Sequence, residues 1–142
     1  YFALADVPLM LRKNKGNFNS WEDLNNPSVK VAVTLGTVQE KRAEVLFDNS
    51  KITKVSSPAR DFQEVLAGRA DISMTSNTEA AKLVEQYPEL MIVPVQKGKN
   101  PTPIAMLLPQ ADQVWINYVN HWIILKKERG FFDRLKGKWL KN

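Results

Sequence analysis

The sequence has no cysteine and only one histidine, His121, among its 142 residues. Without cysteine the chain can form no disulfide, and it has no thiolate that could act as a nucleophile or a metal ligand. A single histidine also argues against a histidine-rich metal site or a histidine-based catalytic triad. Because His121 lies among Trp115, Tyr118 and Trp122, we interpret it as a helix-packing residue. These absences predict a protein that holds no metal.

Glycine and long apolar runs are scarce as well. The six glycines are all separated, so the sequence has no glycine-rich loop of the kind that binds nucleotide phosphates, and we expect no cofactor. No apolar run approaches the roughly 20 residues that cross a bilayer. The chain begins at Tyr1 with neither a methionine nor a signal peptide, which predicts a processed product or a piece of a longer protein. A composition of 44% hydrophobic and 25% charged residues is typical of one folded domain.

The net charge of +5 is confined to the C-terminal end of the chain. Seven basic and only two acidic residues follow Leu125, and the rest of the sequence is neutral. Charges at the end of a helix usually form a solvated face or complement the helix dipole. Since no nucleic-acid-binding motif accompanies the charge, we expect no nucleic-acid partner.

Residues 66–80 contain the clearest pattern for predicting the fold. Gly68 ends one helix in the left-handed conformation that glycine favours, and residues 72–74 form a short buried strand. Ser76 and Glu79 then have the spacing of a capping box, in which a hydroxyl and a carboxylate each bind a free backbone amide at the start of a helix. The order helix, strand, helix predicts a parallel sheet, and ligands bind beyond the carboxyl ends of the strands in such sheets.

Apolar and turn patterns extend this order to the whole chain. They predict strands at residues 7–11, 29–34, 51–55, 72–74, 91–95 and 104–108, with a helix between successive strands among the first five, a loop at residues 96–101, and two more helices after residue 109. In the helix that begins near residue 38, Val38, Val45 and Leu46 are expected to face inward. The sequence therefore predicts an α/β fold with a mostly parallel sheet.

Three strand-to-helix turns share one design, at Gly36 and Thr37, at Ser57, and at Thr75 and Ser76. Ser57 precedes a proline, which fits the first position of a helix. If the three strands are parallel neighbours, the three helix starts meet at one edge of the sheet. Free amides and a partial positive charge at that edge favour a carboxylate, a phosphate or a sulfonate. The alternative is that each hydroxyl only caps its own helix.

Two of these segments resemble a known family. Gly36-Thr37 and the pattern L-x-G-R-x-D-I-x-x-T at residues 66–75 are similar to the second lobe of bacterial extracellular solute-binding proteins of the polar amino-acid class. The resemblance implies the type II periplasmic-binding fold, with helices on both faces of the sheet. It implies that residues 1–108 form the ligand-binding second lobe with its hinge strands. Residues 109–142 would be C-terminal helices that pack on a first lobe missing from this chain.

The same resemblance implies a function. Proteins of this class are periplasmic components of ABC-type uptake systems, which close on a small solute and deliver it to a membrane permease; the signal peptide is not present in this chain. The solute would be anionic or zwitterionic and amino-acid-like, with its acidic group at Thr37 and the neighbouring amides. The ligand-binding residues that the resemblance implies are Gly36, Thr37, Val38, Ser57, Thr75 and Ser76. Ser76 departs from the family, because amino-acid binders usually carry an aspartate there for the ligand's ammonium group.

A branch of the family offers a second function. The pattern M-T-x-x-x-E-A at residues 74–80 and the later P-E-L at residues 88–90 resemble the periplasmic cyclohexadienyl dehydratases. Those enzymes convert prephenate or arogenate to an aromatic product, with a glutamate at the position of Glu79 as general acid. The simpler interpretation of Glu79 is a capping-box residue. A third alternative is the sensor domain of a membrane receptor, since receptors reuse this fold.

Overall fold

A computed structural model describes residues 2–139, which form two compact units. The larger unit is Ala5–Asn100, and the smaller one consists of residues 2–4 together with the chain from Pro101 onward. Two strands, β1 (Phe2–Leu11) and β6 (Lys99–Ile104), pair with each other, and each continues from one unit into the other.

A mixed sheet forms the centre of the larger unit, with the strand order β3-β2-β4-β1-β5 and with β6 paired to β1. The remaining strands are β2 (Lys30–Thr34), β3 (Lys51–Val55), β4 (Ile72–Ser76) and β5 (Leu90–Ile92). β2 runs parallel to both β3 and β4, whereas β1 lies antiparallel between β4 and β5. The predicted α/β fold is confirmed, and the sheet is mixed rather than mostly parallel because the first strand is inserted in the opposite direction.

The pairing register aligns the apolar positions of neighbouring strands. Val31 on β2 lies opposite Ile52 on β3 and Ile72 on β4, and Val7 on β1 lies opposite Thr75 on β4. Successive side chains of a strand point to opposite faces of the sheet, so this register gives each face its own apolar layer.

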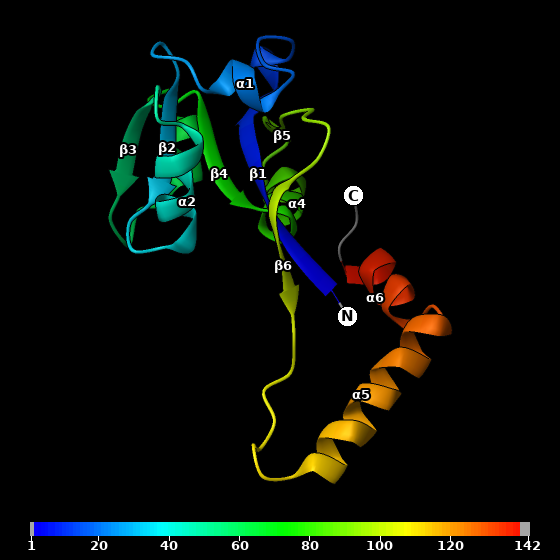
Figure 1. The fold of residues 1–142 in the computed structure, drawn as a ribbon. Helices are drawn as coiled ribbons and strands as arrows, with labels where there is room; N and C mark the ends of the chain where they lie inside the picture. Colours follow the sequence, from blue (N-terminus) through cyan, green and yellow to red (C-terminus); the bar gives the residue numbers. More distant parts are fainter. Residues whose placement is uncertain (1, 140–142) are drawn as a thin grey trace. The chain divides into compact units, whose positions relative to one another are not determined.

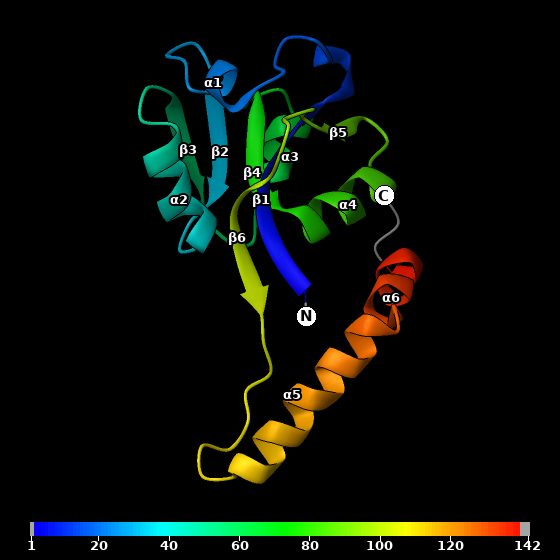
Figure 2. The same ribbon diagram turned by 45° about the vertical axis from the view of Figure 1, so that its right-hand side comes forward.

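Helices cover both faces of the sheet (Figures 1 and 2). α3 (Asp61–Leu66) and α4 (Asn77–Gln86) pack against one face, and α1 (Trp21–Leu24) and α2 (Val38–Leu46) pack against the other. The sheet is therefore the middle layer of three, as the family resemblance implied.

Each face has its own hydrophobic core, and adjacent residues of one strand serve different cores. On β1, Leu9 joins the core beneath α3 and α4, whereas Met10 joins the core beneath α1 and α2. On β2, Ala32 belongs to the first core, and Val31 and Val33 belong to the second. This alternation fixes the register, because a shift of one residue would exchange the two apolar layers.

The turn predicted at Gly68 is confirmed. Gly68 has φ +70°, the left-handed conformation that glycine adopts without a steric penalty, and it directly follows the end of α3. The Asp71 carboxylate accepts a hydrogen bond of 2.8 Å from the backbone N–H of Lys30 at the start of β2. Asp71 thus fastens the turn before β4 to the neighbouring parallel strand.

The inward face predicted for α2 is wrong in part. Val38 and Val45 are 56% and 80% exposed. The residues of this segment that pack in the core are Ala43 on the helix and Phe47 at its end, and Leu46 is partly buried against the same core. Val38 is the first residue of the helix and lies beyond the edge of the sheet's apolar core, so its side chain has nothing to pack against in that core.

The last strand of the sheet is Lys99–Ile104 rather than residues 104–108. Gly98 explains the earlier start, because a Cβ atom at this position would lie 2.9 Å from the Cβ of Ala5. Only a glycine allows the chain to approach β1 so closely just before pairing begins. The apolar run at residues 104–108 suggested a strand, but apolar composition alone does not decide where pairing occurs.

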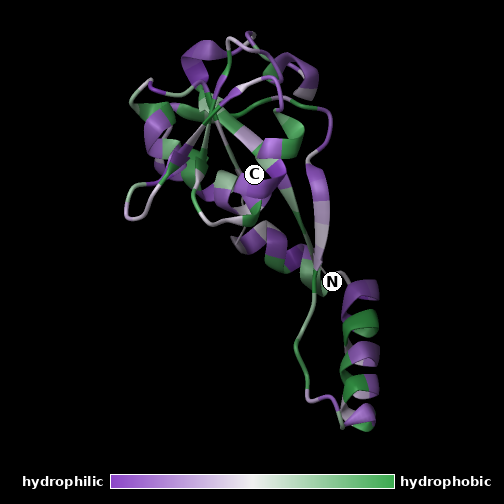
Figure 3. Cartoon of the chain, turned by 60° about the vertical axis from the view of Figure 1, so that its left-hand side comes forward, coloured by the Kyte–Doolittle hydropathy of each residue, from purple (hydrophilic) through white to green (hydrophobic). Residues whose placement is uncertain are grey.

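In the smaller unit, α5 (Gln113–Glu128) and α6 (Phe131–Trp139) pack on each other through aromatic rings. Trp122 and Phe132 meet edge to face, with ring centroids 6.2 Å apart. His121 is exposed on α5 rather than packed within the described residues. Figure 3 shows hydrophobic and hydrophilic residues alternating along α5. None of the helices in residues 2–139 combines the length and the apolar character needed to span a bilayer.

Candidate functional site

A hollow of about 260 Å³ lies where β2, β3 and β4 end and the helices that follow them begin. β2 leads into α2, β3 into α3 and β4 into α4 (Figure 1). Residues from all three of these strand-to-helix regions line the hollow. The residues that line it are Thr34, Thr37, Gln39, Ser57, Arg60, Asp61, Thr75 and Glu79. The prediction that these turns meet at one edge of the sheet is thus confirmed.

The structure brings together part of the predicted set. The predicted residues that line the hollow are Thr37, Ser57, Thr75 and Glu79. The predicted residues that do not line it are Gly36, Val38 and Ser76. Each of the latter is the sequence neighbour of a lining residue.

The start of α2 is held by reciprocal hydrogen bonds. The Thr37 hydroxyl accepts a bond of 3.2 Å from the N–H of Glu40 and donates one of 2.7 Å to the carbonyl of Thr34. The Glu40 carboxylate in turn accepts a bond of 2.7 Å from the N–H of Gly36. The amides of Val38 and Gln39 in the first turn have no acceptor within the helix, so they remain the donors suited to an anionic group.

Glu79 does not complete the capping box that its spacing predicts. The Ser76 hydroxyl accepts a bond of 3.2 Å from the N–H of Glu79, which confirms half of the motif. The Glu79 carboxylate instead turns to the hollow, where one oxygen pairs with the Arg60 guanidinium and the other accepts a 2.6 Å bond from the Thr75 hydroxyl. Two side-chain donors in the hollow outcompete the backbone amide. Both oxygens of Glu79 therefore accept hydrogen bonds, the arrangement of an ionised carboxylate.

The helix predicted to begin at Ser57 begins four residues later. α3 starts at Asp61, and its preceding residue, Arg60, donates its backbone N–H to the Gln63 side chain at 2.9 Å. This bond places the helix cap at Arg60, and the residues from Ser57 to Arg60 form a turn. Ser57 still reaches the hollow, but as a turn residue and not as a helix cap.

The lining residues that the sequence analysis missed are Thr34, Gln39, Arg60 and Asp61, and Asp61 is the buried carboxylate among them. Its side chain is buried, with 6% of the residue exposed. Burial, assisted by the nearby Glu79 charge, raises its pKa to about 6 against the opposing effect of a hydrogen bond from the N–H of Phe62. The sequence did contain a signal for Asp61. An aspartate in the first turn of a helix that begins at the carboxyl edge of the sheet is a candidate ligand-binding residue. The early helix start predicted at Ser57 placed Asp61 in the second turn instead.

The Thr34 hydroxyl lies beside this carboxyl and lowers its pKa slightly, yet its geometry falls outside that of an ordinary hydrogen bond. Thr34 Oγ1 is buried and has no hydrogen-bond partner among the described residues. Buried polar atoms nearly always have a partner, so an unpaired hydroxyl beside a buried carboxyl indicates a place where another molecule completes the bonding.

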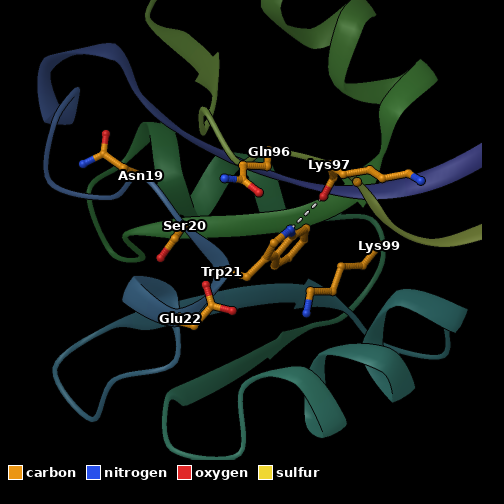
Figure 4. A pocket seen from close by; sticks show the side chains of 8 residues that line it. Asn19, Ser20, Trp21, Glu22, Gln96, Lys97 and Lys99 are labelled. Carbon is orange, nitrogen blue, oxygen red and sulfur yellow. Dashed lines mark hydrogen bonds between the residues drawn. The ribbon is translucent and has the colours of Figure 1, made fainter.

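A second hollow, of about 440 Å³, has a different character (Figure 4). Its wall is formed by residues 19–22 and 96–99. Trp21 Nε1 donates a 2.9 Å bond to the carbonyl of Lys97, and Lys99 Nζ lies 5.7 Å from the centre of the Trp21 ring. The Ser20 and Asp23 side chains form a complete capping box. These contacts join α1 to the chain before β6, and the hollow contains no buried ionisable side chain.

Among residues 2–139, no group of three or more histidine, cysteine, aspartate or glutamate side chains is arranged to hold a metal ion. Asp61 and Glu79 are the two carboxylates of the first hollow, and Glu79 is paired with Arg60. The chemistry of this hollow is therefore that of hydroxyls, two carboxylates, one guanidinium and helix amides.

Comparisons with known proteins agree with this fold, although no family model matches the chain. The cyclohexadienyl dehydratase of Pseudomonas aeruginosa is 27% identical over 140 residues, which are 99% of this chain and 52% of that protein. The solved structure of an ancestral cationic amino-acid solute-binding protein is 33% identical, with a TM-score of 0.83, over 99% of this chain and 60% of its own. A putative binding component of an ABC transporter from Wolinella succinogenes, complexed with lysine, is 23% identical, with a TM-score of 0.80, over 100% of this chain and 61% of its own.

These alignments use nearly all of this chain but only part of each known protein. The chain spans about half the length of the curated relative and about 60% of the two solved structures. Because the match runs from end to end, it includes the sheet, the three helix starts and the two C-terminal helices. The chain has the fold of the second lobe and C-terminal helices of a type II periplasmic binding protein, and it resembles the polar amino-acid class of bacterial extracellular solute-binding proteins near the branch that contains the cyclohexadienyl dehydratases.

Proposed function

We propose that this chain is part of a periplasmic solute-binding protein that takes up a small, amino-acid-like solute in the hollow at the carboxyl ends of β2, β3 and β4. The observation that carries the proposal is the convergence of Thr37, Ser57 and Thr75, from three separate turns, on that one hollow. The amides at the start of α2 and the Arg60 guanidinium suit a carboxylate. Asp61 and Glu79 suit a positively charged or hydrogen-bond-donating group.

The other half of the binding site would come from a first lobe. Two-lobed proteins of this class close on their ligand, and the hollow lies at the edge of the sheet where a second wall is needed to exclude water. The ancestral relative is named for cationic amino acids, and the Wolinella protein was solved with lysine, so amino acids are the first solutes to test. The partner of such a protein would be the membrane permease of an ABC transporter.

We expect the full-length protein to gain thermal stability with at least one of L-lysine, L-arginine, L-glutamine and other small amino acids. A solute present at about 100 times its Kd stabilises the folded state by roughly 2.7 kcal/mol, which raises the melting temperature by roughly 5–10 °C for a protein of this size. Differential scanning fluorimetry across such a panel measures the shift.

A pair of variants tests whether the ligand-induced shift in melting temperature arises from binding in the hollow. Arg60→Gln is expected to reduce it, whereas Arg69→Gln is expected to leave it unchanged, because Arg69 pairs with Glu64 outside the hollow. No shift with any amino acid of the panel would contradict the proposed function.

One observation favours the dehydratase as a second candidate: Glu79 faces the hollow instead of capping its helix. A general acid, however, must carry a proton to donate, and both oxygens of Glu79 already accept bonds from Arg60 and Thr75. We therefore expect the full-length protein to release no phenylpyruvate from prephenate, as measured by absorbance of the product. Release that disappears in Glu79→Gln and persists in Glu64→Gln would replace the binding proposal with the enzyme.

A further inference from the structure

The hollow contains a carboxylate at a position where the sequence did not suggest one. Ser76, which stands where amino-acid binders usually carry an aspartate, does not line the hollow, whereas the buried Asp61 does. We propose that Asp61 receives the protonated nitrogen of the solute, with the Thr34 hydroxyl beside it as a second polar contact. The solute is then a zwitterion or a cation rather than a purely anionic acid. This inference rests on the proposed function and narrows it.

Unfilled hydrogen-bonding capacity at Asp61 and Thr34 supports this assignment. A carboxylate can accept about four hydrogen bonds. The donors that lower the pKa of Asp61 are the N–H of Phe62 and the Thr34 hydroxyl, which leaves about half of its acceptor capacity open, and Thr34 Oγ1 is buried with no hydrogen-bond partner of ordinary geometry among the described residues. An ammonium group has three donors and can bind the carboxylate while it also donates to the hydroxyl oxygen. Such a ligand completes both groups at once.

Glu79 is less suited to the same role. One of its oxygens is paired with Arg60 and the other accepts a hydrogen bond from the Thr75 hydroxyl, so Glu79 already has a counter-charge and two donors in place. Asp61 has no salt bridge of its own among the described side chains. The carboxylate without a counter-charge is therefore Asp61.

The charges of the hollow point in the same direction. Arg60 and Glu79 neutralise each other, and the remaining charge is that of Asp61. A buried charge without a counter-charge is unfavourable, and a cationic nitrogen on the solute supplies the missing partner. A dicarboxylic acid would add negative charge to a site that already has one buried carboxylate in excess.

The test is isothermal titration calorimetry on the full-length protein with L-lysine, L-arginine and L-glutamine as probes. At pH 7.5, Asp61→Asn is expected to weaken the tightest of these by roughly 10- to 100-fold, since one charge-assisted hydrogen bond is lost. Glu64→Gln is the matched control. It removes one negative charge from the same helix, but Glu64 pairs with Arg69 and does not line the hollow, so binding is expected to stay within about twofold.

The pH dependence gives a second readout. The charged groups that face Asp61 are Arg60 beside it and Glu79 from α4. With the pKa of Asp61 at about 6 in the free protein, protonation competes with the solute's cation as the pH falls. The affinity of the wild-type protein is expected to fall about tenfold from pH 7 to pH 5, whereas Asp61→Asn is expected to show a flat profile over that range.

The outcomes separate the two proposals. If an amino acid binds and Asp61→Asn behaves like Glu64→Gln, the role of Asp61 is overturned and the solute-binding function stands. If the wild-type protein binds none of the probes but binds an anionic acid without an amino group, Asp61 is again overturned. If neither the probes nor an anionic acid binds, both the proposed function and the role of Asp61 are overturned. Should Asp61→Asn not fold, the wild-type pH profile decides alone, and a constant affinity from pH 7 to pH 5 overturns the inference.

Discussion

Replacing Phe47 with alanine is expected to lower the free energy of unfolding by roughly 3–5 kcal/mol, the range for a large aromatic removed from a core. Phe47 is fully buried, lies at the end of α2 and stacks on Trp21 with ring centroids 6.0 Å apart. It belongs to the core beneath α1 and α2, so its removal leaves a cavity between two helices and the sheet. Urea unfolding of the full-length protein, followed by far-ultraviolet circular dichroism, measures the loss.

Two further variants separate the cavity from other effects. Phe47→Leu keeps an apolar side chain in the same place and is expected to lose clearly less than the alanine variant. Val45→Ala, on the same helix, removes a side chain that is 80% exposed and is expected to change the free energy of unfolding by less than about 0.5 kcal/mol. A loss at Val45 equal to that at Phe47 would mean that the core beneath α2 is not packed as described.

Local patterns in the sequence were sufficient to place every strand but the last and most of the helix starts. Apolar periodicity and hydroxyl caps are properties of a few adjacent residues, and Thr37 and Ser76 do cap α2 and α4 as their spacing indicates. The order of β2, α2, β3, α3, β4 and α4 then determined that the three turns share one edge of the sheet. Thr37, Ser57, Thr75 and Glu79 followed from that order together with the caps and the family resemblance.

The features that the sequence did not reveal depend on contacts between distant segments. No residue pattern near residues 7–11 indicates that β1 runs antiparallel between β4 and β5, because the direction of strand pairing depends on the topology of the whole sheet. The direction of the Glu79 side chain depends on Arg60, nineteen residues earlier, which supplies a stronger partner than the helix's own amide. The burial of Asp61 is likewise a result of packing, and no local pattern distinguishes it from an exposed aspartate in a helix start.

An ion pair between a buried carboxylate on β1 and a partly exposed guanidinium on α2 is another such feature. Arg42 on α2 places Nη1 3.2 and 3.1 Å from the two carboxylate oxygens of Asp6, which is only 1% exposed. The Asn100 side chain, which lies on β6 and 94 residues later in the sequence, donates a hydrogen bond of 2.9 Å to the same carboxylate. These contacts join β1, α2 and β6 within the larger unit.

Replacing Arg42 with methionine is therefore expected to destabilise the protein by about 3 kcal/mol, because the buried Asp6 carboxylate loses its cation while the apolar stem of the side chain is largely retained. The double variant Asp6→Asn with Arg42→Met is expected to lose less than the single Arg42→Met, since it leaves no uncompensated charge. Arg69→Met, which breaks an exposed pair with Glu64, is the control and is expected to cost less than about 1 kcal/mol. Urea unfolding of the four proteins measures these differences. Equal losses for Arg42→Met and Arg69→Met would show that the Asp6 carboxylate does not depend on Arg42 for its burial.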